Sequence, residues 1–127
     1  MKRLLTGHGP SVAYALLIFI LSSLPSLKSP DIGISFQDKI YHVLEYAVLG
    51  FLLQRGFENP GGSAWKRFLL ISAIGVGYAA SDEIHQWFVP GRECDFLDFL
   101  ADAAGVLAGQ AVFSARGIWM PTDKKKF

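Results

Sequence analysis

The sequence VAYALLIFIL, residues 12 to 21, lies in a stretch without charged side chains that extends from residue 4 to residue 27. A helix needs roughly 20 apolar residues to cross a bilayer, so this stretch is long enough for one span. Lys2 and Arg3 precede it, as in a signal peptide, but there is no convincing cleavage site and further apolar segments follow. The stretch therefore predicts an uncleaved transmembrane helix.

Composition points to the same class of protein. The 127 residues are 51% hydrophobic and only 18% charged, which is an apolar composition for a small soluble protein. We expect one domain, residues 1–127, because neither a repeat nor a linker divides the chain. The net charge of +1 argues against binding to nucleic acid. The single cysteine, Cys94, cannot form an internal disulfide.

Three further segments have helical character, at residues 38–54, 66–88 and 96–115. Proline and glycine separate them from each other and from the first stretch. The prediction is an all-α fold in which four transmembrane helices form a small bundle. A soluble four-helix bundle is the alternative, but the first stretch has no polar face to present to water.

The distribution of Lys and Arg predicts the orientation, because basic connections tend to stay in the cytoplasm. With the N-terminus inside, nine basic residues are cytoplasmic and three are outside. We therefore expect a multi-pass membrane protein with both termini in the cytoplasm. The inner set is Lys2, Arg3, Arg55, Lys66, Arg67, Arg116 and Lys124 to Lys126, and the outer set is Lys28, Lys39 and Arg92.

In this orientation, the acidic ends of the last three segments meet at the outer face. Six of the eleven acidic residues lie between residues 81 and 102. Ionised side chains facing lipid would cost roughly 2.5 to 3.5 kcal/mol each, so they should face one another or a wet cavity. Residues three or four apart share a helix face. The predicted faces are Asp38, His42, Glu45 and Tyr46; Tyr78, Asp82, His85 and Gln86; and Asp95, Asp98 and Asp102, continuing into Gly105 and Gly109.

The two glycines, Gly105 and Gly109, form a G-x-x-x-G pattern on the face that carries the acids. Small residues at this spacing allow two membrane helices to approach closely. We expect the last helix to pack against a neighbour along this face, which would bring its aspartates to that neighbour as well.

The chain resembles the VanZ-like membrane proteins in the run D38-K-x-x-H42-x-x-E-Y46-x-x-L-G50, then S81-D-E-x-H-Q86, then P90-G-R92-x5-D98-x3-D102-x2-G105. The resemblance implies a small bacterial membrane protein of the cell envelope. The family is named for a member associated with antibiotic resistance, namely resistance to the glycopeptide teicoplanin. The family usually carries Asn in place of Asp102, so a role of the asparagine amide in the family is not carried over to this chain. The function expected from the resemblance is to bind or modify an envelope component in a polar pocket that faces outward.

Three kinds of site fit these residues. A catalytic site would use histidine or carboxylate as acid or base on a lipid-linked or cell-wall substrate; its candidates are Asp38, His42, Glu45, Asp82, His85 and Asp98. A ligand pocket would bind an envelope lipid, a cell-wall precursor or a glycopeptide; its candidates are Lys39, Tyr46, Glu83, Gln86, Arg92 and Asp102. A divalent metal is the candidate cofactor, and its predicted ligands are His42, Glu45, Asp82 and His85.

The fourth interpretation is a structural network without a ligand. Arg92 would then pair with Asp95 or Asp98, and Glu83, on the far side of the helix from Asp82, would pair with Lys39 or face water. Asp38 would serve as the N-cap of its helix. Whether the protein is an enzyme stays open at this point, because the familiar nucleophile and nucleotide motifs are absent from the sequence.

Overall fold

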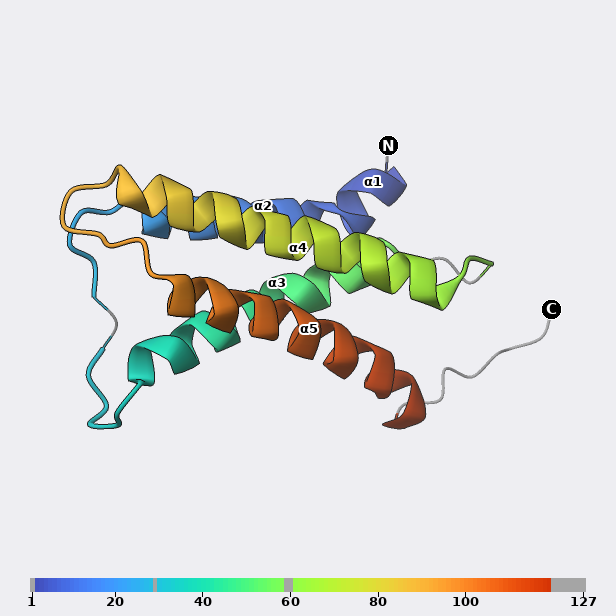
Figure 1. Cartoon of the computed structure of the whole chain (residues 1–127). Coiled ribbons are helices and arrows are strands. Elements are labelled where there is room, and N and C mark those ends of the chain that lie inside the picture. The colour runs from blue at the N-terminus through green and yellow to red at the C-terminus, as the bar shows by residue number, and fades with distance from the viewer. Residues whose placement is uncertain (1, 29, 59–60, 120–127) are drawn as a thin grey trace.

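The computed structural model describes residues 2–28, 30–58 and 61–119, and within them it contains helices and no strand. A short helix, α1 (Lys2–Gly7), precedes four longer ones: α2 (Gly9–Ser22), α3 (Gln37–Gly56), α4 (Ala64–Trp87) and α5 (Phe96–Trp119). Figure 1 shows α2 and α4 side by side, while α3 and α5 cross each other beneath them. The prediction of an all-α chain with four main helices is confirmed. Lys124 to Lys126 lie outside the described residues.

The first apolar stretch forms two helices instead of one uninterrupted span. The break falls at His8, the N-cap residue of α2, and Pro10 occupies the first turn. Proline fits the first turn of a helix and not its interior, so a single helix through this point is disfavoured. α2 ends at Ser22, and its 14 residues span about 21 Å. That length is less than the roughly 30 Å of a bilayer's hydrocarbon core.

The other three helices begin and end close to the predicted positions. At the start of α4, the side chain of Ser63 accepts a hydrogen bond from the backbone N–H of Lys66, as an N-cap does. α3 begins differently, because its N-cap is Phe36, with a φ of 62° and no side-chain cap. Asp38 is therefore not the N-cap; it lies in the first turn of α3, where negative charge is favourable.

α3 and α5 form the closest helix pair, and glycine makes their approach possible. A Cβ atom on Gly105 would lie 3.0 Å from the backbone nitrogen of Ala47, and one on Gly109 would lie 2.7 Å from that of Phe51. From the other side, a Cβ on Gly50 would lie 2.9 Å from the Cα of Val106. The predicted close packing along Gly105 and Gly109 is confirmed, and the partner helix is α3.

Val106 joins this pair to α4. Its side chain is fully buried, and a Cβ atom on Gly75 of α4 would lie 2.6 Å from Val106 Cγ1. Tyr46, Leu49 and Ile71 complete the buried centre around it. The core is therefore narrow, and most of the helix surface faces outward.

The α2–α3 and α4–α5 connections lie together at one end of the molecule (Figure 1). Gly91 has a φ of 76°, and a Cβ atom there would lie 3.1 Å from the Cβ of Ser26. Next to it, Arg92 Nη1 donates a hydrogen bond of 2.8 Å to the carbonyl of Leu27. The two connections thus hold each other in place and form the rim of the site described below.

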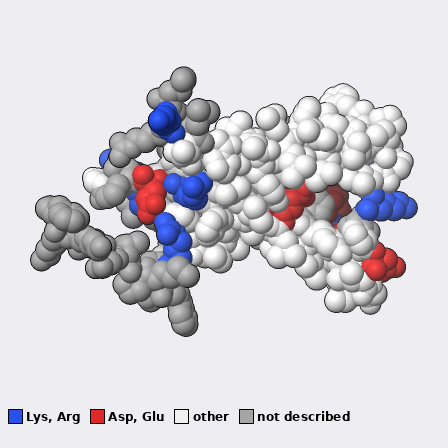
Figure 2. Space-filling view, turned by 180° about the vertical axis from the view of Figure 1, so that it is seen from behind, with Lys and Arg blue, Asp and Glu red and all other residues white. Residues whose placement is uncertain are grey.

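The outer surface is typical of a membrane protein. Large apolar side chains are exposed along the helices, among them Leu16, Ile20, Leu70 and Val112. In Figure 2, charged side chains gather toward the two ends, with acids visible in a hollow near one of them. Within the described residues, Phe96–Arg116 is the stretch that is long and apolar enough to cross a bilayer, and α2 is a shorter apolar helix.

Replacing Gly109 with alanine should destabilise the protein, because the new methyl group would overlap the backbone of α3. We expect a loss of about 1–3 kcal/mol, as for other overpacked positions. Gly77→Ala is the matched control, since nothing lies within 4 Å of a Cβ at that position of α4. Thermal unfolding in detergent, followed by circular dichroism, should show a lower midpoint for Gly109→Ala only. Equal midpoints for the two variants would contradict the close α3–α5 crossing.

Candidate functional site

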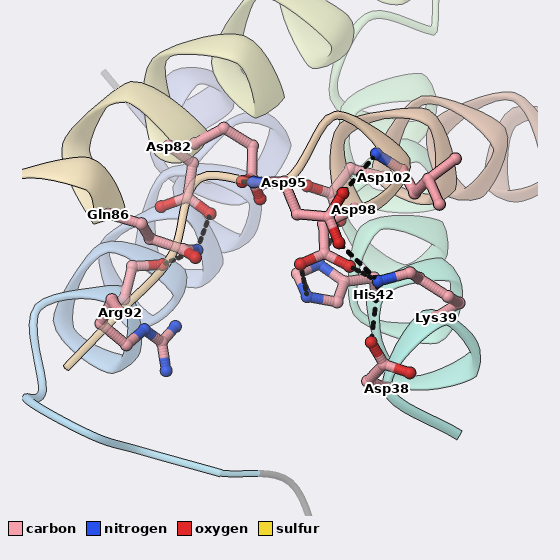
Figure 3. A network of polar contacts seen from close by, with 12 residues as sticks. Asp38, Lys39, His42, Asp82, Gln86, Arg92, Asp95, Asp98 and Asp102 are labelled. Atoms are coloured by element: carbon pink, nitrogen blue, oxygen red, sulfur yellow. Dashed lines mark hydrogen bonds and ion pairs between the residues drawn. The ribbon is translucent and has the colours of Figure 1, made fainter. Parts of the chain in front are cut away.

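A pocket of about 740 Å³ opens at the end where the two connections meet. The apolar part of its lining includes Leu21, Leu27 and Pro30. The remaining lining is largely polar, and it includes six residues that the sequence predicted for the site: Asp38, His42, Glu45, Gln86, Arg92 and Asp98. The polar side chains form two groups, one around Lys39 and His42 of α3 and one around Asp82 and Gln86 of α4. Figure 3 shows the first pair beside the aspartates of α5 and the second pair on the other side of the view.

Lys39 is the cation of the first group. Its ammonium forms ion pairs with Asp38 Oδ2 at 2.8 Å, with Asp95 Oδ2 at 3.0 Å and with Asp98 Oδ1. The hydrogen bond from Lys39 lowers the pKa of Asp95, which precedes α5, below its usual value. Lys39 therefore links the start of α3 to the start of α5 and offsets one of the three negative charges of these aspartates.

His42 lies one turn deeper on α3, between two aspartates of α5. Its Nδ1 is 2.7 Å from Asp102 Oδ1, and its Nε2 is 3.6 Å from Asp98 Oδ2. Asp102 is fully buried, whereas His42 keeps 19% of its side chain exposed and lines the pocket. The histidine is thus held by a buried carboxylate while part of its ring faces the cavity.

The second group is a buried network centred on Asp82. Tyr46 donates a hydrogen bond of 2.9 Å to Asp82 Oδ2, and Gln86 Nε2 donates one of 3.3 Å to the same oxygen. Gln86 Nε2 also donates to Ser22 Oγ at 3.4 Å. This network joins α2, α3 and α4, and all four side chains are buried.

Glu83 does not occupy the position that the structural interpretation gave it. The expectation of an ion pair with Lys39, or of contact with water, is wrong, because Glu83 is only 3% exposed. Its Oε2 accepts a hydrogen bond from the backbone N–H of Asp95, and its charge lies near His42 and Asp102. No sequence pattern indicated the burial of Glu83. It follows Asp82 directly, so the rotation of α4 decides which of the two side chains is buried, and in the structure both are.

Two other expected contacts are replaced by contacts with α2 and the segment after it. Arg92 bonds to the carbonyl of Leu27 instead of to Asp95 or Asp98, whose cation is Lys39. His85 Nε2 lies 2.9 Å from Ser23 Oγ, and its ring stacks on Phe19. His85 is therefore a packing residue between α4 and α2.

The structure groups the possible metal ligands differently from the sequence. Three possible ligand atoms lie within 4.8 Å of one another, one each from His42, Glu83 and Asp102. Of the predicted set, only His42 belongs to this group; Glu45 lines the pocket, Asp82 bonds to Tyr46, and His85 contacts α2. An imidazole held at one nitrogen by a carboxylate is suited to two roles, as a general base or as a ligand in a metal site.

The match to a family model covers α2 to α5. The model described as VanZ/LLP1 matches residues 11–119. The chain belongs to the VanZ/LLP1 family. The family resemblance predicted from the motifs is thereby confirmed, and the match includes both groups of polar side chains. No curated protein and no solved structure shows significant similarity to this VanZ/LLP1 chain.

Lys39→Met should destabilise the protein at neutral pH, because Asp95 and Asp98 would lose their shared cation. We expect a loss of about 2 kcal/mol, between the values for exposed and for fully buried charge pairs. Adding Asp98→Asn to this variant should restore part of the lost stability, because it removes one of the unpaired carboxylates. Urea unfolding of the single and double variants in detergent would measure both effects, and equal stability of wild type and Lys39→Met would contradict the pairing.

The Lys39→Met effect should also depend on pH. Because Lys39 lowers the pKa of Asp95, this carboxylate stabilises the fold above the pKa of the unfolded chain, about 4. The contribution disappears as pH falls through the lowered pKa. The difference in unfolding midpoint between wild type and Lys39→Met should therefore shrink between pH 7 and pH 3, and a difference that grows on acidification would be inconsistent with this ion pair.

Proposed function

We propose that this VanZ/LLP1 protein crosses the bacterial plasma membrane four times and binds the polar head group of an envelope amphiphile in its outward-facing pocket. The observation that supports the proposal is the composition of the pocket lining, which combines the apolar residues Leu21, Leu27 and Pro30 with charged side chains. A lipid-linked molecule has the same two parts, an apolar chain and a polar head group.

Arg92 and Lys28 give the pocket lining a means of binding an anionic group such as phosphate. Arginine has five N–H donors in a planar fork, and the bond to Leu27 uses one of them. The acids Asp38 and Asp98 are already paired with Lys39, which reduces their repulsion of an anion. Glu45 offers an acceptor for hydroxyl or amine groups of the head group. We therefore infer a phosphate-bearing, lipid-linked ligand of the kind used in cell-wall synthesis.

The exposed apolar surface supports insertion of all four main helices, and a bilayer can thin around a span as short as α2. α3 and α4 each carry polar residues toward one end, yet the two acids of α4, Asp82 and Glu83, are buried in the bundle and do not face the lipid. Basic residues at the opposite end of the molecule favour the cytoplasmic side for it: Arg55 in the last turn of α3, Lys66 and Arg67 in the first turn of α4, and Lys2 and Arg3 near the N-terminus. The pocket then faces outward, and its floor lies within the membrane.

The native Cys94 provides a direct test of orientation, because it is exposed in the α4–α5 connection. A membrane-impermeant maleimide should label Cys94 in intact spheroplasts. Gly62→Cys in a Cys94→Ser background places the probe in the α3–α4 connection and should be labelled only after lysis. The reverse pattern would contradict the proposed orientation, and labelling of both in intact cells would contradict the span between them.

Ligand binding can be tested with a polyprenyl phosphate and the purified chain in nanodiscs. We expect saturable binding by the wild type that Arg92→Gln weakens roughly 10- to 100-fold, the value of a charge-assisted hydrogen bond of about 1.5–3 kcal/mol. Arg55→Gln, at the opposite end of α3, is the matched control and should bind as the wild type does. Equal binding by Arg92→Gln and Arg55→Gln, or no binding by the wild type, would refute the proposal.

A further inference from the structure

His42, Glu83 and Asp102 leave two carboxylate oxygens without a partner beneath the pocket. Glu83 Oε1 and Asp102 Oδ2 are buried and accept no hydrogen bond within the part of the chain that the structure describes. The residues themselves are 3% and 0% exposed. Buried carboxylate oxygens are normally satisfied, because their hydration is expensive to remove. Two such oxygens beside one imidazole therefore favour a site for a positively charged ligand.

Charge leads to the same conclusion. Lys39 forms ion pairs with the outer carboxylates, Asp38, Asp95 and Asp98. Within the described residues it forms no ion pair with Glu83 or Asp102. Asp102 has His42 as its only ion-pair partner in these residues, and Glu83 has none. A second positive charge at this position would offset the cost of burying the two acids in a medium of low dielectric constant.

We propose that His42, Glu83 and Asp102 bind a divalent transition-metal cation, of which Zn²⁺ is the representative. An imidazole with two carboxylates is a ligand set that suits such ions and is unlike the all-oxygen shells of Ca²⁺ and Mg²⁺. Three protein ligands with an open position are also the arrangement of zinc sites that bind a further molecule.

The three ligands come from three helices and are held by other contacts. Glu83 of α4 is anchored through Oε2 by the backbone N–H of Asp95, which leaves Oε1 for the cation. Asp102 of α5 contacts His42 of α3 through Oδ1, which leaves Oδ2. Their possible ligand atoms lie within 4.8 Å of one another, so small side-chain shifts would bring them to a common ion.

The exposed part of the His42 ring places the cation under the floor of the pocket. A bound phosphate could then complete its coordination, which is the one step that rests on the proposed function. Cation binding itself does not need the amphiphile, so the two proposals can fail separately.

The test uses the full chain in detergent, carrying Cys94→Ser to remove the exposed thiol, after treatment with a chelator. Zn²⁺ alone is titrated by isothermal calorimetry, and Co²⁺ is used in parallel for its visible absorption. We expect one ion per chain with micromolar or tighter affinity and a raised unfolding midpoint. Changes to residues around a metal cost 10- to 100-fold in affinity, so removal of a direct ligand by Glu83→Gln or His42→Gln should cost at least about 100-fold.

Glu58→Gln, an exposed position at the opposite end of the bundle, is the matched control and should bind Zn²⁺ with unchanged affinity. The assignment would be overturned if Glu83→Gln and Glu58→Gln weakened Zn²⁺ binding equally, or if neither variant weakened it. A wild type that takes up no ion and shows no shift in its unfolding midpoint would also overturn it. This wild-type result decides the question even where a ligand variant fails to fold.

Discussion

The contact between His42 of α3 and Asp102 of α5 is the interaction on which the site depends. It needs the two helices to approach closely, and Gly105 and Gly109 allow this because they bring no Cβ atom into the backbone of α3. With the helices at this distance, a fully buried carboxylate meets an imidazole at the pocket floor. Larger residues at the crossing would separate the pair and leave a buried charge without its partner.

A balance of charge follows from this contact. Lys39 forms ion pairs with the carboxylates at the pocket mouth, and His42 forms one with Asp102 in the interior. Asp82, in contrast, accepts hydrogen bonds from the hydroxyl of Tyr46 and the amide of Gln86. Hydrogen bonds from neutral groups favour the ionised form of a carboxylate but leave its negative charge without a counter-charge. The acidic excess is therefore greatest in the interior, and this is where a cation or a ligand with donor groups would contribute most.

Local sequence patterns predicted the helices better than they predicted the partners of the polar side chains. Proline and glycine marked the connections between the four main helices, and the G-x-x-x-G pattern indicated the face of α5 that packs closely. Pro10 was visible in the first apolar stretch, but hydropathy outweighed it and the break at His8 was missed. The burial of Glu83 depends on how α4 is rotated between its neighbours, and no local pattern encodes that rotation.

The most direct test of the account is ¹⁵N NMR of the histidine side chains in metal-free protein, with the His42 signals assigned by His42→Gln. We predict an imidazole whose Nδ1 is protonated and hydrogen-bonded to a carboxylate, and whose ¹⁵N shifts change markedly in Asp102→Asn. The ring of His8, at the opposite end, should be unaffected. His42 shifts that are identical in wild type and Asp102→Asn would show that the two residues do not meet, and would contradict the arrangement of α3 and α5.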